Sequence, residues 1–330
     1  MNNKTILITG GAGFIGHHII YKFLCETNCK IISLDRLDYS GSYNRIHEII
    51  KNNVNFSKRI KIIWHDLKAE INPLIFKNIP KPNIILHVAA ASHVDRSIQD
   101  PMSFVQDNIV GTVNILEYAR KIKKLEKFLY FSTDEVFGPA PKNIKFLEND
   151  RYRSGNPYAA SKAGAEEMCV AYENTYKLPI IITHTMNVIG ERQHPEKFVP
   201  KIINHVLNNK ILTIHSNKSK TKAGSRFYIH AKDVSDAVLF ILKNGKLGEK
   251  YNIVGSKEID NYELAKIISE HLNKKLKYKF VDFHSSRPGH DLRYALSGEK
   301  LKKMGWTPKK NIKKRIIEIV DWTLKNKDWL

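Results

Sequence analysis

The chain has 330 residues, of which 42% are hydrophobic and 26% are charged. This balance is typical of a globular protein, and it excludes a disordered chain, a collagen-like fibre and a disulfide scaffold. At about 150 residues per domain, the length predicts about two domains. The formal net charge is +21, from 54 basic and 33 acidic residues.

The positive charge has three interpretations: a nucleic-acid partner, an anionic small substrate attracted by the field, or a lysine-rich solvated surface. Lysines are spread along the chain, with clusters at 274–279, 300–303 and 309–315. The clusters are not interleaved with stacking aromatic residues, as a single-strand binding surface would be. We therefore favour a solvated surface, place the anionic substrate second, and expect no nucleic-acid partner.

Cysteine usage and hydropathy bear on the compartment. Cys25, Cys29 and Cys169 cannot all pair and form no CxxC motif, which favours a reducing compartment. The spacing of Cys25 and Cys29 predicts two thiols on one helix face, but with no second pair nearby we expect no metal. No apolar run approaches the roughly 20 residues of a membrane span, and no signal peptide precedes the first strand. We expect a cytoplasmic protein with no membrane partner.

The first 190 residues alternate short apolar strands with helical segments. Because the strands are apolar on both faces, they are typical of a covered parallel sheet. The alternation predicts an α/β fold, a Rossmann-like doubly wound parallel sheet with right-handed crossovers. Strands are predicted at residues 5–9, 30–35, 60–65, 83–88, 127–133 and 179–186, and helices at 14–25, 43–52, 102–122 and 157–176.

Beyond residue 190 the alternation ends. We expect a Rossmann domain over residues 1–190 and a smaller C-terminal substrate-binding lobe over 191–330, with segments from about 226 to 255 able to return to the first domain. In the lobe we predict polar loops at 216–224 and 285–290, and helices at 232–243, 262–272 and 310–327, the last amphipathic and basic.

A glycine-rich turn follows the first strand. Gly10, Gly13 and Gly16 form GxxGxxG, a variant of the dinucleotide-binding fingerprint, and they open a helix. Glycines permit a tight turn and a close backbone approach, and the helix N-terminus offers N–H groups and its dipole to a pyrophosphate. Asp35, 19 residues after Gly16, is placed to accept a ribose 2′-OH, which favours NAD; Arg36 directly after it is of the type that accommodates the 2′-phosphate of NADP.

Three further residues have predicted roles. Asp66, at the end of the third strand, either contacts the adenine amine or caps a turn.

Tyr158 and Lys162 are four residues apart on a predicted helix and therefore share one face. Tyrosine, with a pKa near 10, is a poor base at pH 7, but a neighbouring ammonium lowers that pKa. The pair predicts a proton-transfer device beside a nicotinamide.

These motifs resemble the extended short-chain dehydrogenase/reductase superfamily and, within it, the nucleoside-diphosphate-glucose 4,6-dehydratases that act on dTDP-glucose or UDP-glucose. Ser-His-Val-Asp-Arg-Ser at 92–97 and Thr-Asp-Glu-Val at 133–136 are more specific than the glycine turn and Tyr-x-x-x-Lys. The matching segments follow in order over nearly the whole chain: 9–16, 87–98, 132–138, 158–162, 195–197 and 287–291.

Asp134 and Glu135 distinguish a dehydratase from its relatives. They follow a predicted strand, at the edge where α/β sheets bind ligands. A 4-epimerase of the superfamily needs no acid–base pair for elimination at this place, whereas a dehydratase does. The alternative is a pair of solvated loop carboxylates.

The resemblance implies an NAD-dependent hydro-lyase. A hydride leaves C4 of the glucose for NAD while Tyr158 takes the 4-OH proton. Glu135 removes the C5 proton and Asp134, which requires a raised pKa, protonates the departing 6-OH. The hydride then returns to C6 and Glu135 reprotonates C5. Thr133 would bond the 4-OH, so the implied catalytic residues are Thr133, Asp134, Glu135, Tyr158 and Lys162.

The resemblance also implies a homodimer built on helices 102–122 and 157–176, and a role in deoxysugar synthesis such as that of rhamnose.

The resemblance implies binding residues as well, and cations among the substrate contacts suit a diphosphate. The cofactor contacts would be Gly10, Gly13, Phe14, Ile15, Gly16, Asp35, Asp66, Leu67, Ala89, Ala90, Asp107, Asn108, Tyr158 and Lys162. The substrate contacts would be Ser92, Thr133, Asn187, Lys197, Arg226, Asn261, Arg287 and His290.

The chain departs from the family pattern on the nucleotide side. Phe137 replaces a usual Tyr, Asn187-Val-Ile-Gly190 replaces Asn-Asn-Tyr-Gly, and the stretch before Arg226 is longer and basic. Because these departures are from the bacterial dTDP pattern, they favour UDP-glucose slightly. The rival hypotheses are a nucleotide-sugar 4-epimerase and, given the charge, an RNA-binding or scaffold member of the superfamily. The histidines have no metal-binding spacing, so we read them as structural or surface residues: His17, His18, His93, His194 and His230.

Overall fold

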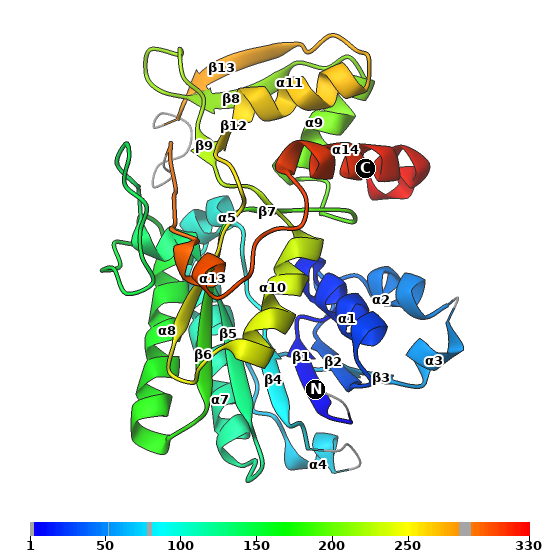
Figure 1. Cartoon of the computed structure of the whole chain (residues 1–330), viewed down its shortest axis with the longest axis vertical. Coiled ribbons are helices and arrows are strands. Elements are labelled where there is room, and N and C mark those ends of the chain that lie inside the picture. Colours follow the sequence, from blue (N-terminus) through cyan, green and yellow to red (C-terminus); the bar gives the residue numbers. More distant parts are fainter. Residues whose placement is uncertain (1–2, 52, 78–80, 284–291) are drawn as a thin grey trace. The chain divides into compact units, whose positions relative to one another are not determined.

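The computed structural model describes residues 3–51, 53–77, 81–283 and 292–330 (Figure 1). The chain divides into two compact units, each assembled from separate stretches of sequence. Unit 1 comprises residues 1–136, 156–184 and 235–251, and unit 2 comprises residues 137–155, 185–234 and 252–330.

Unit 1 is built on a seven-stranded sheet in the order β11-β6-β5-β4-β1-β2-β3. The first five strands in the sequence, β1 to β5, pair in parallel, with Ile6 of β1 opposite Ile31 of β2 on one side and Ile84 of β4 on the other. This is the strand order of a doubly wound nucleotide-binding sheet, and it confirms the predicted fold class. The strands are β1 (Thr5–Thr9), β2 (Lys30–Asp35), β3 (Ile60–Trp64), β4 (Ile84–His87), β5 (Lys127–Thr133), β6 (Ile180–Thr185) and β11 (Lys250–Ile253).

Helices cover the sheet of unit 1. Ile115 of α7 and Ala165 of α8 pack with Phe128 of β5 in a fully buried core. An ion pair of 2.5 Å between Lys22 and Asp236 joins α1 to α10, which lie side by side in Figure 1. The helices are α1 (Phe14–Glu26), α2 (Tyr43–Ile50), α3 (Val54–Ser57), α4 (Pro73–Phe76), α5 (Val94–Gln99), α6 (Pro101–Phe104), α7 (Gly111–Arg120), α8 (Pro157–Tyr176) and α10 (Ala231–Asn244), with the turn η2 (Asp134–Phe137) after β5.

The single helix predicted over 102–122 is wrong in one respect, because a π-helical turn, η1 (Val105–Val110), separates α6 from α7. The turn places Asn108 against the chain after β4. Its Oδ1 accepts the N–H of Ala91 at 2.8 Å and its Nδ2 donates to the carbonyl of the same residue at 3.0 Å. The periodicity of the helix sequence cannot reveal these contacts, because they join segments that are distant in the chain. Such turns often occur at functional sites.

The expectation that Cys25 and Cys29 share a helix face is also wrong. Helix α1 ends at Glu26, and the hydroxyl of Thr27 donates to the carbonyl of Phe23 at 2.6 Å. Cys25 is exposed, Cys29 is buried beyond the helix end, and neither forms a disulfide. Within the described ranges, no group of three or more His, Cys, Asp or Glu side chains is arranged to hold a metal ion.

Unit 2 combines helices with three two-stranded pairs. β7 (Val188–Ile189) pairs with β10 (Ile229–His230) and β8 (Leu212–Ser216) with β13 (Tyr278–Asp282), both in parallel, while β9 (Ser225–Arg226) pairs with β12 (Ile259–Asp260) in antiparallel. The sequence did not predict these strands, because most are two residues long. Helices α11 and α14 match the predicted 262–272 and 310–327. The helices are α9 (Phe198–Leu207), α11 (Asn261–His271), α13 (Glu299–Lys303), α14 (Ile312–Lys325) and η3 (Lys327–Trp329).

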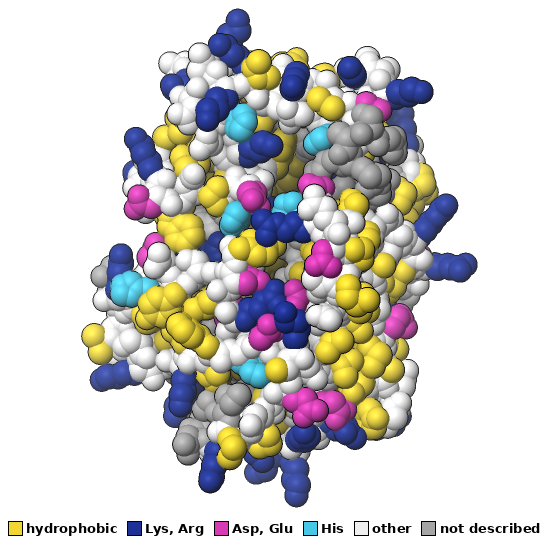
Figure 2. Space-filling model, turned by 180° about the vertical axis from the view of Figure 1, so that it is seen from behind, with side chains coloured by type: hydrophobic (Ala, Val, Ile, Leu, Met, Phe, Trp, Pro, Cys, Tyr) yellow, Lys and Arg dark blue, Asp and Glu magenta, His cyan; other side chains and the backbone are white. Residues whose placement is uncertain are grey.

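The charged side chains do not gather into one patch on the face seen in Figure 2. Lys and Arg side chains are scattered over that face, and Asp and Glu side chains lie among them. This distribution agrees with the solvated-surface interpretation of the net charge. Among the helices that the structure describes, none is long and apolar enough to cross a membrane.

A buried ion pair joins the β7 and β10 segments of unit 2. Glu191 is buried, its carboxylate lies 3.3 Å from Nε2 of His230, and the ammonium of Lys232 donates to it. Burial acts to raise the pKa of Glu191, but the hydrogen bonds and charges of His230 and Lys232 outweigh burial and hold that pKa well below its usual range.

We predict that Glu191→Gln lowers the free energy of unfolding by about 2 kcal/mol at pH 7, the usual contribution of hydrogen bonds to a charged group. Because the native pKa of Glu191 lies below the unfolded value of 4.5, this stabilisation is present above about pH 4.5 and is lost as the pH falls towards the native pKa. Urea unfolding at pH 7 and pH 3 tests this, with Glu196→Gln as an exposed control. A difference that stays constant between the two pH values would contradict the prediction.

Candidate active site

The glycine turn after β1 is sterically restricted to glycine. Gly10 has φ of +68°, and a Cβ there would lie 2.8 Å from the backbone of Ala89. A Cβ on Gly16 would lie 2.1 Å from the carbonyl oxygen of Gly10. Helix α1 begins directly after Gly13, which provides no side-chain cap for the first N–H groups. The turn lies between β4 and β2, where the strand order reverses, and it fits a dinucleotide pyrophosphate.

Asp35 fixes the end of β2 beside this turn. It is buried, its Oδ2 accepts the N–H of Ala12 at 3.0 Å and its Oδ1 accepts the N–H of Leu37 at 2.9 Å. Burial raises the pKa of Asp35, and the two hydrogen bonds oppose that rise. Each oxygen keeps a second lone pair, so the carboxylate can still accept a hydroxyl.

Arg36 is enclosed by carboxylates. Its Nη1 and Nη2 donate to the two oxygens of Asp107 at 2.6 and 2.8 Å, and its Nε and Nη2 donate to Asp38 at 2.8 and 2.6 Å. Asp66 lies 3.7 Å from Nη1. Four of the five N–H donors of the guanidinium are therefore used within the protein. The bonds to Asp107, against the cost of burial, raise the pKa of Arg36 further.

Asp66 takes one of its two predicted roles in the structure. Its Oδ1 accepts the N–H of Lys68 at 3.0 Å and its carbonyl accepts the N–H of Ala69 at 3.0 Å, so it caps the turn after β3. A contact with adenine stays a prediction.

The five predicted catalytic residues converge at the carboxyl end of β5. Thr133 is the last residue of β5, and its hydroxyl donates to Asp134 at 3.1 Å and accepts the N–H of Glu135 at 3.3 Å. From α8, Tyr158 forms a hydrogen bond with Thr133, and the ammonium of Lys162 donates to the carbonyl of Phe131 at 2.8 Å. Two segments about 20 residues apart in sequence thus build one site.

The pKa of Tyr158 departs from the sequence-based expectation. Burial raises it, the charges of Glu135 and Asp134 raise it further, and the hydrogen bond with Thr133 opposes them. The expected lowering by Lys162 is wrong for this state of the protein, because that ammonium bonds a backbone carbonyl and lies 4.2 Å from the ring centre of Tyr130. Burial lowers the pKa of Lys162 to about 8.

Residues that the sequence did not single out hold Tyr158 in place. Its backbone N–H donates to the hydroxyl of Ser97 at 3.1 Å, and its carbonyl accepts the hydroxyl of Ser161 at 2.8 Å. Asn108, predicted as a cofactor contact, donates to that Ser161 hydroxyl at 2.9 Å. The ring packs edge-on against Phe104, with centroids 6.3 Å apart. Ser97, Phe104 and Asn108 come from α5, α6 and η1, so no spacing along α8 signals them.

A buried ionic cluster lies along the same face of α8. Glu166, one turn beyond Lys162, is fully buried and accepts His184 at 3.2 Å and Lys250 at 2.9 Å. These partners come from β6 and β11, so the cluster fastens α8 to the far strands of the sheet. The spacing of residues 158, 162 and 166 is a helical signal that the sequence analysis did not use.

The predicted substrate contacts in unit 2 lie on several elements. Asn187 is exposed before β7, and Lys197 precedes α9. Arg226 and Asn261 are brought near each other by the β9–β12 pairing; Arg226 lies 4.5 Å from the ring centre of Tyr294, and Asn261 accepts the Tyr228 hydroxyl at 2.5 Å. Ser92, in unit 1, is exposed. Arg287 and His290 lie outside the described residues.

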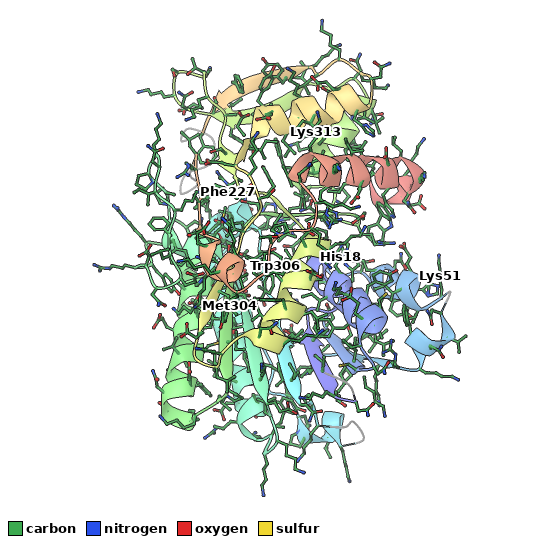
Figure 3. All side chains as sticks on the ribbon, in the orientation of Figure 1. His18, Lys51, Phe227, Met304, Trp306 and Lys313 are labelled. Atoms are coloured by element: carbon green, nitrogen blue, oxygen red, sulfur yellow. The ribbon has the colours of Figure 1, made fainter. Side chains whose placement is uncertain are left out.

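His17, His18 and His93, three histidines of unit 1 named in the sequence analysis, serve packing and capping. His17 and His18 (the latter labelled in Figure 3) are buried in α1 with ring centres 4.1 Å apart. His93 accepts the N–H of Arg96 at 3.4 Å and so caps α5.

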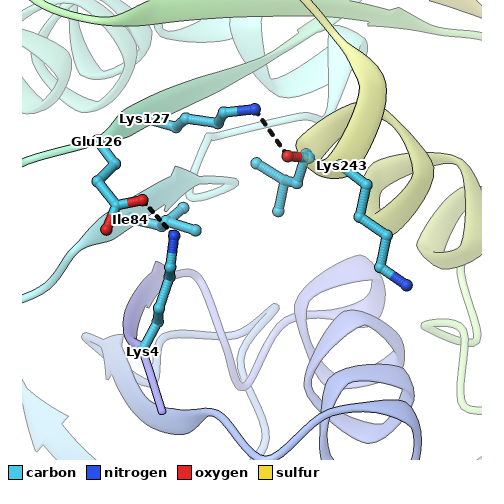
Figure 4. Close-up of a pocket in the computed structure, with 6 residues that line it drawn as sticks. Lys4, Ile84, Glu126, Lys127 and Lys243 are labelled. Atoms are coloured by element: carbon cyan, nitrogen blue, oxygen red, sulfur yellow. Dashed lines mark hydrogen bonds and ion pairs between the residues drawn. The ribbon is translucent and has the colours of Figure 1, made fainter. Parts of the chain in front are cut away.

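A pocket of about 290 Å³ lies at the opposite edge of the sheet, where β1, β4 and β5 begin (Figure 4). Lys4 pairs there with Glu126, and the ammonium of Lys127 donates to the carbonyl of Leu242 at 2.7 Å. These groups satisfy one another, and the carboxyl ends of the strands, where the predicted residues gather, are at the other edge. We therefore do not assign the active site to this pocket.

Comparisons with known proteins agree with this geometry. Residues 7–319 match the profile described as GDP-mannose 4,6 dehydratase. The dTDP-D-glucose 4,6-dehydratase of Homo sapiens is 38% identical, covering 98% of this chain and 91% of the relative. The structure of DesIV, a dTDP-glucose 4,6-dehydratase from Streptomyces venezuelae with NAD and TYD bound, is 30% identical with a TM-score of 0.88 over 98% of each chain. A UDP-glucose 4-epimerase from Thermus thermophilus, complexed with NAD, is 28% identical with a TM-score of 0.84, covering 96% of this chain and 98% of the epimerase.

The fold, the converging residues and these matches define a short-chain dehydrogenase/reductase of the extended type, and the chain belongs to its nucleoside-diphosphate-sugar 4,6-dehydratase family. The sequence-based recognition is thereby confirmed. The protein is an enzyme of the hydro-lyase class.

Proposed function

We propose that this chain is an NAD-dependent dTDP-glucose 4,6-dehydratase that yields the 4-keto-6-deoxyglucose nucleotide. The observation that carries the proposal is the convergence of Thr133, Asp134 and Glu135 with Tyr158 and Lys162 at the end of β5. The sequence departures favour UDP-glucose slightly. We prefer dTDP-glucose because it is the substrate named for the human and Streptomyces relatives, which match nearly the whole chain.

NAD fits the residues around the glycine turn. The absence of a Cβ at Gly10 and Gly16 leaves room for close backbone approach, α1 offers its N-terminus, and Asp35 can accept a ribose hydroxyl. Phe14, Ile15, Leu67, Ala89, Ala90 and Asn108 complete the proposed set. When bound, NAD supplies the acceptor for a hydride from C4 and the donor that returns it to C6.

Tyr158 is the group that moves the proton of the sugar 4-OH, and the Thr133 hydroxyl, already bonded to it, orients that oxygen. Lys162 lies one helical turn away. Because burial lowers its pKa to about 8, it is mostly protonated at pH 7 and keeps a positive charge on the same face of α8 as Tyr158.

Asp134 and Glu135 carry out the elimination. The C5–H bond breaks, its proton goes to Glu135 and its electrons form the C5=C6 bond. The C6–O bond breaks, and the hydroxyl leaves as water with a proton from Asp134. The 4-ketone formed first makes the C5 proton acidic enough for a carboxylate base.

Unit 2, we propose, binds the nucleotide diphosphate. Lys197 and Arg226 supply positive charge, and Asn187 and Asn261 supply amides. The division into a cofactor domain over 1–190 and a substrate lobe over 191–330 remains part of this proposal, as do the roles of Ser92, Arg287 and His290. Cys25, Cys29 and Cys169 form no disulfide, which suits a reducing compartment, and we propose the cytosol. We propose deoxysugar synthesis, such as that of rhamnose, as the purpose.

Incubation with dTDP-glucose or UDP-glucose, followed by mass spectrometry, tests the function. We expect loss of one water from dTDP-glucose, at least tenfold faster than from UDP-glucose. Asp134→Asn should lower kcat at least about 100-fold, the usual contribution of a general acid. Glu167→Gln, on the exposed face of α8, is the control. An isomer of unchanged mass would identify a 4-epimerase instead, and inert substrates with NAD bound would favour a binding protein.

The carboxylates around Arg36 generate a prediction about the cofactor. Because they use four of its donors, Arg36 is not available to grip a 2′-phosphate, and Asp38, Asp66 and Asp107 repel one. We expect the protein to bind NADH at least about 100-fold more tightly than NADPH, by fluorescence titration of cofactor-stripped protein. Asp38→Asn should reduce that ratio at least about threefold, since it removes one repelling charge.

Glu70→Gln makes the same charge change at an exposed position near Asp66 and should leave the ratio within about twofold. Equal affinities in the wild type would show that Arg36 does serve the phosphate. If Asp38→Asn and Glu70→Gln change the ratio of NADH to NADPH affinity equally, the preference for NADH comes from the overall charge of the protein and not from the carboxylates around Arg36.

We also propose a homodimer through the segments predicted as helices 102–122 and 157–176, which the structure forms as α6, η1, α7 and α8. Large apolar side chains are exposed there, including Met102 at 62%, Val105 at 37% and Tyr176 at 45%. Exposed apolar side chains of this size often contribute to interfaces between subunits. Sedimentation equilibrium of the wild type should give a molar mass twice that of one chain. Met102→Glu should lower the measured mass towards that of a single chain. A wild-type monomer at micromolar concentration would exclude the proposal.

A further inference from the structure

Asn156 joins the catalytic helix to the carboxylate of Glu135. It is buried immediately before α8, where Pro157 occupies the first helical position. Its Oδ1 accepts the N–H of Ala159 at 2.8 Å, so it is the N-cap of α8. Its Nδ2 donates to Oε2 of Glu135 at 3.1 Å. One side-chain amide therefore contacts both the segment that carries Tyr158 and the end of β5.

The two contacts determine the orientation of the amide. Only an oxygen can accept the N–H of Ala159, so the NH₂ group of Asn156 must face Glu135. The bond to Glu135 is then a donor to a carboxylate, a type roughly twice as strong as a bond between neutral groups. A serine at this position would also cap α8, but it has no NH₂ group to reach Glu135.

The position of Glu135 makes such a contact useful for orienting its carboxylate. It is only partly buried, on the short turn η2, and its N–H to Thr133 fixes its backbone rather than its carboxylate. A glutamate side chain has three rotatable bonds, and a base must hold its oxygen close to the proton that it removes.

We propose that Asn156 is a positioning residue for the dehydration: it holds the Glu135 carboxylate for removal of the C5 proton. The inference rests on the proposed function, in which Glu135 is that base. The contribution of Asn156 falls on the elimination, where the C5 proton moves to Glu135 as water leaves from C6. The earlier transfer from C4 does not use the Asn156–Glu135 bond.

Three variants separate positioning from capping. Asn156→Ser retains a good N-cap and removes the donor to Glu135, whereas Asn156→Asp retains the cap and places a carboxylate against a carboxylate. Asn311→Ser is the matched control, since Asn311 caps α14 by accepting the N–H of Lys314 at 2.9 Å, within unit 2. Thermal midpoints of all three should lie within a few degrees of the wild type.

We expect kcat for loss of water to fall at least about tenfold in Asn156→Ser and at least about 100-fold in Asn156→Asp, with KM changed less than about threefold. The isotope effects on kcat identify the step. With the sugar deuterated at C5, the effect in both variants should be at least as large as in the wild type. With deuterium at C4, the effect should shrink towards one, because the elimination then limits the rate.

Other outcomes would overturn the inference. A kcat of Asn156→Ser within about threefold of the wild type would show that the bond to Glu135 is dispensable. A slow variant with an increased C4 isotope effect would assign Asn156 to the Tyr158 step, and an unfolded Asn156→Ser protein would assign it to stability. A wild type that dehydrates no nucleotide-glucose would overturn the proposed function and this inference together, whereas an active wild type with a normal variant overturns the inference alone.

Discussion

The packing of α8 along β5 is the constraint on which the candidate site depends. The two elements pack against each other through fully buried residues such as Ala165 and Phe128. This contact brings the polar side chains at the start of α8 to the carboxyl end of β5. A polar group buried there must find a partner, and the partners of Tyr158 and Lys162 are groups of β5 and η2. The same packing that stabilises the sheet therefore assembles the proposed catalytic groups.

The cofactor side of unit 1 relies on a different kind of constraint. Close approach of the backbone at Gly10 and Gly16 is steric, and it acts whatever the pH or salt concentration. The constraint at Arg36 is electrostatic, because its single positive charge is shared among the carboxylates of Asp38, Asp66 and Asp107. The first constraint admits a dinucleotide, and the second determines which charge its ribose end can carry. An adjacent arginine in the sequence is thus not evidence for NADP unless its donors are available.

Burial shifts the pKa values of Tyr158 and Lys162 in opposite directions. Desolvation raises the pKa of Tyr158 and lowers that of Lys162, so both shifts favour the neutral forms. The spacing of these two residues describes them as an isolated pair, for which a lowered pKa of the tyrosine is expected. The neighbouring carboxylates account for the rest of the difference, since Asp134 and Glu135 disfavour a phenolate at the same place.

By itself, the sequence determined six of the seven strands of the Rossmann sheet, the limits of α8, the glycine turn and the five candidate catalytic residues; β11 was not predicted. These are local signals: a run of apolar residues, a helical spacing, or a motif shared with a family. Only the tertiary structure decided that η1 interrupts the helix predicted over 102–122, that Arg36 is held by Asp107, and that Asn156 reaches Glu135. Each of these contacts joins residues from about 20 to 70 positions apart in the chain. Their partners are chosen by the three-dimensional course of the backbone, which no local pattern encodes.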